Sequence, residues 1–330
     1  MKKIKIGTFN AYNLVLPNTT YYNWKKYSSN EYRQKVDWMG AQLDKMDADV
    51  IGFQEIFHRS ALQDVLDASE NCKGYHIVMS KPASGDNAPS PAPIVALATK
   101  HKILDYHVIE NFDELLMLDE DISVPITKFS RPVLIAELEA YGKQITVFVV
   151  HLKSKRPMIM KGEDSNDPFS QAKGQARSLI RRAAEATALR KLLLQYLENR
   201  NYPVVLLGDV NDAGGAVTTE ILAGQEPFIY WKKGKKIKYW DVLLYNVKNI
   251  QARKSYQDFY FTHIHNGHHE SLDHVMVSQE FVKENPHRIG QVRYVLVLND
   301  HLRDNTLSSD GVECWQSDHA QVVATIEFEE

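Results

Sequence analysis

Residues 203–212 read PVVLLGDVND, and this stretch is the most informative part of the chain. Five apolar or proline residues predict a buried strand that ends at Gly208, where the missing side chain lets the backbone bend out of the sheet. Asp209 and Asn211 then lie two residues apart in extended chain, so both can point to the same side. Asp209 could accept a proton from an attacking water, and Asn211 could position that water or a phosphate oxygen. A turn of the Asx type, completed by Asp212, is the structural alternative.

The same arrangement, a polar residue at the end of an apolar run, recurs across the chain. In a layered fold, such residues project into one shared site at the ends of the strands and not into the core. Carboxylates, amides and imidazoles that converge there would bind a hard cation and a phosphate. The motifs are Asn10 in TFN, Glu55 in IGFQEI, His151 in VVHLKS, Asp209 with Asn211 in LLGDVND, Asp273 in SLDHVMVS, and Asp318 with His319 in QSDHAQVV.

Three of these residues are candidate metal ligands. Glu55 offers a carboxylate, and Mg²⁺ commonly binds one or two protein carboxylates while it keeps several waters. Asn10 could ligate the metal through its carbonyl oxygen or orient Glu55 through its amide. Asp318 is expected to contribute to the metal too. A lone glutamate after a strand is usually a solvated strand end, so the prediction depends on the set of residues.

Two histidines are candidates for phosphate chemistry. His319 needs a carboxylate to orient it, and Asp273 is a plausible one, because a carboxylate-paired imidazole keeps its proton and can hold a phosphate. His151 could donate a proton to a leaving oxygen or bind the phosphate, although a hydrogen-bonded strand end would explain it equally well. Arg131 and Lys153 are candidate substrate-binding residues near two of the predicted strands.

The hydrophobic pattern predicts alternating strands and helices. A first strand runs from Ile4 to Asn10, a helix follows near 29–46, and a buried strand spans 49–54. The longest predicted helix covers about 172–199, with a core stripe of leucine and alanine from Leu179 to Leu197 and with arginines on solvated faces. Loops are predicted at 81–93 and 153–171. Further strands are predicted at 75–79, 94–99, 132–139, 144–150, 203–208, 256–262, 272–278, 292–298 and 320–328.

These elements predict one domain over residues 1–330, of the α/β (α+β) class. Two mixed β-sheets are expected to pack face to face with helices outside, which is a four-layer αββα sandwich. Hydrophobic residues make up 44% and charged residues 25% of the chain, as in soluble globular proteins. The sequence shows no signal peptide and no membrane span, so we expect a cytoplasmic protein, with leaderless export left open. No protein partner is predicted.

Charge and cysteine content narrow the function classes. A formal net charge of −3 argues against a protein that coats nucleic acid through bulk charge, so local patches or a metal must attract a polyanion. Cys72 and Cys314 are too few for a disulfide framework. The segment HIHNGHH (263–269) could be a zinc cluster, but Asn266–Gly267 favours a hairpin. The lysines of 231–240 (WKKGKKIKYW) could contact nucleic acid or form a solvated turn.

The ordered set TFN…QE…HLKS…GDVND…SLDHVMVS…SDHAQV resembles the endonuclease/exonuclease/phosphatase superfamily, in its bacterial, deoxyribonuclease I-like branch. The resemblance spans about residues 4–327 and implies the four-layer sandwich and divalent-metal hydrolysis of a phosphate ester. Tyr12 stands where AP endonucleases carry an aspartate, which argues against abasic-site cleavage. The resemblance implies a metal site at Asn10 and Glu55, nucleophile activation by Asp209 and Asn211, metal or water assistance by Asp318, phosphate contact by His319 oriented by Asp273, and the branch's histidine at His151.

Three functions are compatible with this set of residues. The first is a Mg²⁺- or Mn²⁺-dependent nuclease that hydrolyses a phosphodiester, with DNA the favoured substrate. The second is a hydrolase of a phospholipid or of a phosphorylated small molecule that uses the same site. The third is a binding module without catalysis, which should have lost some of the central polar residues. Because all of them are present, the binding module ranks last, and the lysine-rich segments make the nuclease the first choice.

Overall fold

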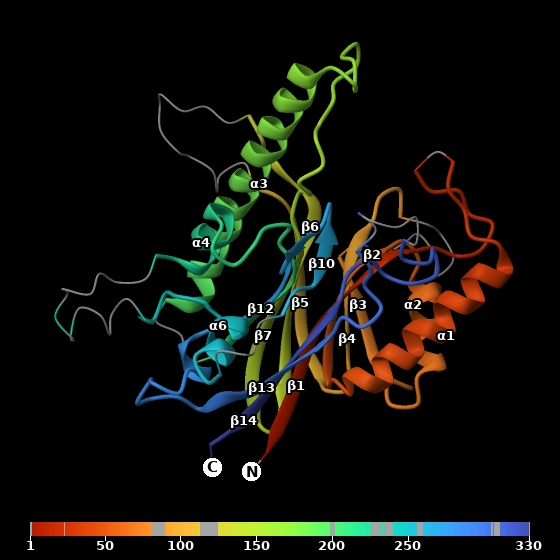
Figure 1. Cartoon of the computed structure of the whole chain (residues 1–330). Coiled ribbons are helices and arrows are strands. Elements are labelled where there is room, and N and C mark those ends of the chain that lie inside the picture. The colour runs from red at the N-terminus through yellow and green to blue at the C-terminus, as the bar shows by residue number, and fades with distance from the viewer. Residues whose placement is uncertain are drawn as a thin grey trace.

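Two mixed six-stranded sheets pack face to face in the computed structural model of the protein (Figure 1). Helices cover both outer faces, so the predicted four-layer αββα sandwich is confirmed. The two chain ends lie side by side, where Phe328 N donates to Lys2 O at 2.9 Å. The structure describes residues 2–22, 24–80, 90–112, 125–198, 202–225, 232, 234, 240–255, 260–304, 306 and 311–329.

The first sheet has the order β13-β14-β1-β2-β4-β3 and the second has the order β5-β6-β7-β8-β12-β9. Each sheet contains one parallel pair, β1 with β2 and β7 with β8. The first sheet consists of β1 (Lys3–Leu14), β2 (Val50–Ile56), β3 (His76–Met79), β4 (Ile94–Thr99), β13 (Gly290–Leu298) and β14 (Gln321–Phe328). The second consists of β5 (Lys102–Asn111), β6 (Lys128–Ala140), β7 (Lys143–His151), β8 (Val204–Asp209), β9 (Tyr245–Asn246) and β12 (Asp273–Val277).

Three apolar layers hold the sandwich together. Between the sheets, residues such as Ile6 and Leu207 form one fully buried cluster. On the outer faces, Leu43 and Leu62 pack on the first sheet and Leu189 packs on the second. Each such side chain contributes roughly 1.5–3 kcal/mol when fully buried. The helices are α1 (Ser29–Met46), α2 (Arg59–Ala68), α3 (Pro168–Leu197), α4 (Val217–Ala223), α6 (Val247–Ala252) and the 3₁₀ turn η1 (Gln279–Phe281).

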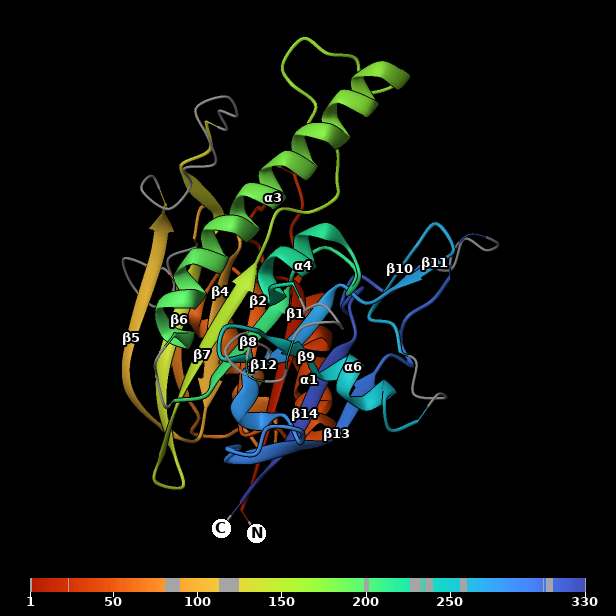
Figure 2. The same ribbon diagram turned by 90° about the vertical axis from the view of Figure 1, so that its left-hand side faces the viewer.

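The two long helices lie on opposite outer faces, α1 on the first sheet and α3 on the second (Figures 1 and 2). The bounds of α1 are those predicted, because Ser28 and Glu31 form a complete capping box. α3 begins at Pro168, four residues earlier than predicted, because the Asp167 side chain accepts a hydrogen bond from Ser170 N at 2.7 Å. Within the described helices, no segment has both the length and the apolar composition to cross a membrane.

The predicted faces of α3 are partly wrong. Leu179, expected in the core, is 50% exposed, because the first half of the helix extends beyond the sheets (Figure 1). Arg182, expected on a solvated face, is buried, and so is Glu185 on the next turn. Both bind partners at the site described below. The polar side of α3 is therefore part of the protein interior.

Several other segments differ from the prediction. β5 and α2 were not predicted, since most of β5 is exposed, with apolar side chains mixed among polar ones, and α2 is short. Residues 260–262 are not a strand, and 256–259 lie outside the described residues. So do 81–89 of the first loop and most of 231–240. The hairpin in HIHNGHH is confirmed as β10 (His263–His265) and β11 (His268–Glu270), which lie outside both large sheets (Figure 2).

Candidate active site

The candidate site lies where neighbouring strands of the second sheet carry polar residues at one end. The parallel pair β7 and β8 sets His151 opposite Asp209, and the antiparallel β12 sets Asp273 opposite Asp209. Register alone therefore makes these side chains neighbours. At Gly208, φ is +142° and a Cβ would lie 2.0 Å from Val150 O, so only glycine fits where the strand turns toward the site.

Asp209 is the centre of the site, with a side chain that is 2% exposed. Its Oδ2 accepts a hydrogen bond from Asn10 Nδ2 at 3.2 Å and lies 3.4 Å from His151 Nε2 and 3.9 Å from His319 Nε2. Burial raises the pKa of Asp209; the charge on His319 opposes this effect, and the facing Asp273 carboxylate adds to it. A buried carboxyl of this kind is suited to accept a proton near neutral pH.

His319 and Asp273 form a buried pair, with 2.8 Å between Nδ1 and Oδ2. Burial alone would lower the pKa of His319, but the carboxylates of Asp273 and Asp209 together hold it well above its usual value. The ring is therefore a cation, and its Nε2 faces Asp209 Oδ2 at 3.9 Å and Asp318 Oδ1 at 4.0 Å. Burial, followed by the charge of Arg131, lowers the pKa of His151, so that imidazole is neutral.

The first sheet contributes Asn10 and Glu55 through irregular backbone. β2 has a register shift around Glu55, whose φ is +63°, and β1 has one directly after Asn10, with Tyr12 at φ +47°. Left-handed φ at a residue other than glycine is strained, and such bulges occur next to active sites because they redirect a side chain. Here they bring both side chains of the first sheet to the same end as Asp209.

The oxygens at this end fit a divalent cation. Burial raises the pKa of Glu55, and the nearby Asp318 carboxylate raises it further. The positive charges around the two carboxylates therefore do not fully balance their negative charge. Asp318 Oδ1 is buried and accepts no hydrogen bond from any residue in the described part of the chain. Carboxylate oxygens in this state are the ligands that Mg²⁺ and Mn²⁺ prefer. The Asn10 amide donates to Asp209 and its Oδ1 accepts from Tyr12 N at 3.0 Å, so Asn10 orients Asp209 and not Glu55.

The remaining predicted residues hold the loops around the site. Asn211 N donates to Asp209 Oδ1 at 2.8 Å and Asn211 Nδ2 donates to Leu152 O at 3.0 Å, so the Asx-type turn and the site coexist. Arg131 Nη1 also donates to Leu152 O, at 3.2 Å, and its charge reaches Glu55 and His151. The Lys153 ammonium instead donates to Ser154 O at 3.0 Å and to its hydroxyl at 3.1 Å, so it is turned toward its own loop.

Three polar residues that support these loops were missed by the sequence analysis. Glu185 Oε2 accepts from Lys153 N at 2.8 Å, and Arg182 lies 3.4 Å from Asp212. Thr218 Oγ1 donates to the same Asp212 carboxylate. Arg182 and Glu185 are three residues apart on α3, a spacing that places them on one face. That spacing was the available signal.

Lys35, near Tyr12, was not singled out from the sequence, and His263, near Asp318, was considered only as part of a possible zinc cluster in HIHNGHH. Lys35, on α1, is fully buried, and its Nζ lies 5.7 Å from the Tyr12 ring and 5.4 Å from the Tyr27 ring, with no hydrogen-bond acceptor among the described residues. Burial lowers the pKa of Lys35 to about 8. His263 on the hairpin lies 4.0 Å from Asp318 Oδ2, and its ring centroid is 4.8 Å from that of His319.

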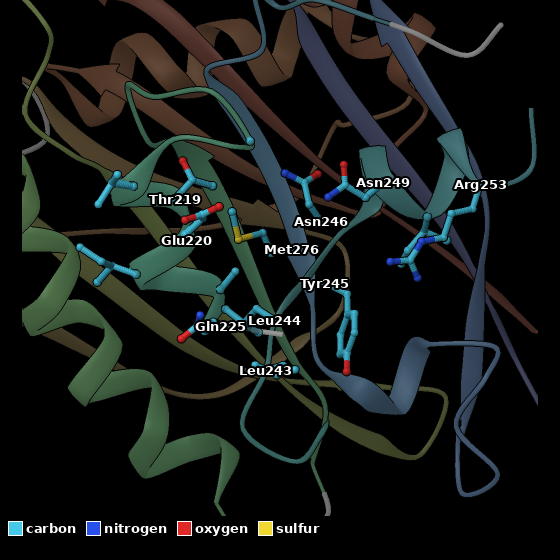
Figure 3. Close-up of a pocket in the computed structure, with 16 residues that line it drawn as sticks. Thr219, Glu220, Gln225, Leu243, Leu244, Tyr245, Asn246, Asn249, Arg253 and Met276 are labelled. Carbon is cyan, nitrogen blue, oxygen red and sulfur yellow. The ribbon is translucent and has the colours of Figure 1, made fainter. Parts of the chain in front are cut away.

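A cavity of about 680 Å³ lies away from these carboxylates, between α4, α6 and β9 (Figure 3). Glu220 is the single carboxylate among its described lining residues. Asn246 connects the cavity to Asp212, because Asn246 Nδ2 lies 2.7 Å from His274 Nδ1 and His274 Nε2 lies 2.8 Å from Asp212 O. Without facing carboxylates and imidazoles, this cavity is not the catalytic centre.

The sequence matches the model of the endonuclease/exonuclease/phosphatase family over residues 7–319. The chain belongs to this family. Family members are phosphoric ester hydrolases and typically depend on a divalent metal. No curated protein matches the sequence.

Solved structures with the same fold are distant in sequence. The catalytic domain of human Nocturnin with a bound sulfate is 15% identical, with 99% of this chain and 95% of that chain covered and a TM-score of 0.58. A mannosyl-6-phosphatase from Bacteroides thetaiotaomicron is 15% identical over 98% and 100%, with a TM-score of 0.56. D. rerio TDP2 complexed with a single-strand DNA product is 14% identical over 99% and 100%, with a TM-score of 0.55. The fold is the DNase I-like fold.

Proposed function

We propose that the protein is a divalent-metal-dependent phosphodiesterase, and specifically a nuclease. The observation that carries this proposal is the contact of Asp209 with three groups, Asn10, His151 and the Asp273-paired His319, beside the partly unneutralised carboxylates of Glu55 and Asp318. One side of the site can hold a proton and the other can hold a cation. General-base catalysis and metal-ion catalysis both promote the attack of water on a phosphate ester, and the site has groups for each.

Asp209 takes the proton of the attacking water in this proposal. The water oxygen forms the new bond to phosphorus, the bond from phosphorus to the ester oxygen breaks, and the leaving oxygen takes up a proton. Burial raises the pKa of Asp209 toward the range of a general base, and the Asn10 amide fixes the carboxylate. Asn211 holds the turn that carries Asp209.

The imidazoles bind the phosphate. His319, cationic beside Asp273, presents Nε2 to a phosphoryl oxygen. His151 is neutral, so binding a phosphate oxygen through an N–H suits it better than acting as a general acid. Arg131 adds positive charge at the same place. Lys153 would have to leave its loop acceptors before it could contact a substrate.

Glu55 and Asp318 would hold the cation, which we propose to be Mg²⁺ or Mn²⁺, with Asn10 beside them. A bound cation of this type polarises the phosphoryl oxygen and stabilises the charge on the leaving oxygen. The role of this chain is to place the oxygen ligands. The left-handed backbone at Glu55 directs its carboxylate to the site.

Nucleic acid is the substrate that we propose, with DNA favoured. The TDP2 structure, which has this fold, holds a single-strand DNA product. The mannosyl-6-phosphatase on the same fold makes hydrolysis of a small phosphoester the second candidate. The two candidate substrates differ in the scissile phosphate, which carries an organic group on both sides in a nucleic acid and on one side in a phosphomonoester.

A substrate panel tests the proposal. The purified protein, with Mg²⁺, Mn²⁺ or chelator, is incubated with plasmid DNA, single-stranded DNA, RNA, sphingomyelin and inositol phosphates. We expect cleavage of nucleic acid with either metal and none with chelator. Release of phosphate from a small ester without cleavage of any nucleic acid would overturn the nuclease proposal.

A further inference from the structure

A second cavity, of about 390 Å³, opens directly beside the catalytic residues. Tyr12 and Asp318 of the site line it, together with His263 and His265 of the hairpin. Its volume lies within the roughly 300–1,000 Å³ that is typical of pockets for small organic groups. A group bound here would lie next to a phosphate held by His319 and next to the proposed cation site at Asp318.

The walls of this cavity, which we name the hairpin pocket, include flat rings. The rings of His263 and His265 lie nearly parallel, with 6.2 Å between centroids and 26° between planes. Tyr12 is half-buried and held in place, because its N donates to Asn10 Oδ1 and its O accepts from Tyr27 OH at 3.2 Å. Rings held in this way are surfaces on which a nucleobase stacks, at roughly 1–3 kcal/mol per base.

The polar groups of the hairpin pocket suit a base better than a second phosphate. Its lining holds one guanidinium, Arg303, and one carboxylate, Asp318. Phosphate recognition relies on clustered cations, which would have to outnumber the carboxylate. The Asn266 amide is exposed; its Nδ2 lies 3.2 Å from His265 Nε2, and its oxygen can accept from the edge of a base. Arg303, also exposed, forms no ion pair within the described part of the chain, so it can meet the next phosphate of a strand.

We infer that the hairpin pocket binds the nucleoside on one side of the scissile phosphate. This inference rests on the proposed function and specifies its substrate: a strand or chain end from which one nucleoside can enter the pocket. Paired bases inside an intact duplex could not enter without first leaving the stack, which costs a few kcal/mol. His265 and Arg303 are then specificity residues outside the catalytic set.

The test compares a dinucleotide, thymidylyl-thymidine, with its two truncated forms, the methyl esters of thymidine 3′-phosphate and of thymidine 5′-phosphate. With Mn²⁺, we expect kcat/KM for one methyl ester to be at least about tenfold lower than for the dinucleotide, because that ester leaves the pocket empty. His265→Ala should lower kcat/KM of the dinucleotide by about fivefold or more and leave that ester within about twofold. His268→Ala, on the other strand of the hairpin and outside the pocket lining, is the matched control and should change neither substrate.

A binding measurement separates this inference from the proposed function. With Ca²⁺ in place of Mn²⁺, a thymidine monophosphate (the 3′ or the 5′ isomer) should bind about tenfold tighter than inorganic phosphate or deoxyribose 5-phosphate, and His265→Ala should abolish the difference. If the enzyme hydrolyses no diester but still binds thymidine monophosphate more tightly, the nuclease proposal is wrong and the inferred nucleoside binding in the hairpin pocket is supported. Equal binding of thymidine monophosphate and deoxyribose 5-phosphate, or an equal loss in His265→Ala and His268→Ala, overturns the pocket.

Discussion

The two sheets build their halves of the site in opposite ways. In the second sheet, His151, Asp209 and Asp273 are direct partners on regular strands, and each side chain is at most 2% exposed. In the first sheet, Glu55 lies in a bulge with left-handed backbone, and the Asp318 side chain, just before β14, is 35% exposed. The regular half is closed and the irregular half is open.

This difference matches the two tasks of the site. A proton acceptor with a shifted pKa needs burial and fixed partners, which regular strands in register provide. A cation and a substrate have to enter and leave, so their ligands need an open position. The strained φ at Glu55 is maintained by the surrounding sheet and is the kind of strain found at functional sites. The two halves can therefore be tested by separate substitutions.

The largest effect is expected at Asp209, in the closed half, and at His319, which pairs with Asp273 of that half. Asp209→Asn or His319→Ala should lower kcat by about 10³-fold or more, as for groups that act together in one catalytic unit. The substrate is the nucleic acid that the wild type cuts best, and circular dichroism serves as the check on folding. A folded variant with more than about a tenth of wild-type activity would remove the assigned role.

Asp273→Asn should have the next largest effect, roughly 10²-fold on kcat/KM. The carboxylate of Asp273 raises the pKa of His319, so its removal lets the imidazole lose its proton at lower pH. The alkaline limb of the pH–rate profile should therefore move to lower pH. An unchanged profile would mean that the pair is structural only.

In the open half, Glu55→Gln should weaken metal binding and leave the proton chemistry in place. We expect the concentration of Mn²⁺ that gives half-maximal activity to rise by roughly tenfold or more, with activity recovered in part at saturating metal. The same shift should be seen without substrate, by electron paramagnetic resonance of Mn²⁺. A variant that binds Mn²⁺ normally but is inactive would place Glu55 outside the metal site.

Lys35, buried beneath the open half, should affect stability more than activity. Its pKa is lowered from 10.5 to about 8, which corresponds to a cost of up to roughly 3 kcal/mol when the unfolded chain is protonated. This cost is absent above pH 10.5, grows as the pH falls toward 8, and is complete below 8. Lys35→Met should therefore raise the free energy of unfolding in urea at pH 7, and the gain should shrink toward pH 10.5. A gain that is equal at both pH values would assign the effect to packing alone.

The sequence predicted the closed half better than the open half. Hydrophobic periodicity locates β7, β8 and β12, and because register then sets their ends together, Asp209 and Asp273 follow from local pattern. No hydrophobic pattern marks the bulge at Glu55. None indicates that the Asn10 amide donates to Asp209. Arg182 was assigned to a solvated face, and Glu185 was not singled out, because α3 was considered without the loops that cover it. The hairpin was predicted from Asn266–Gly267, but its position beside Asp318 depends on tertiary packing.

Crystals soaked in Mn²⁺ and measured at the manganese absorption edge test most directly whether the two halves form one centre. We expect an anomalous peak at coordination distance from Glu55 and Asp318, on the side of the site that faces His319. A peak at another place on the molecule, or none at a Mn²⁺ concentration that supports full activity, would contradict this expectation.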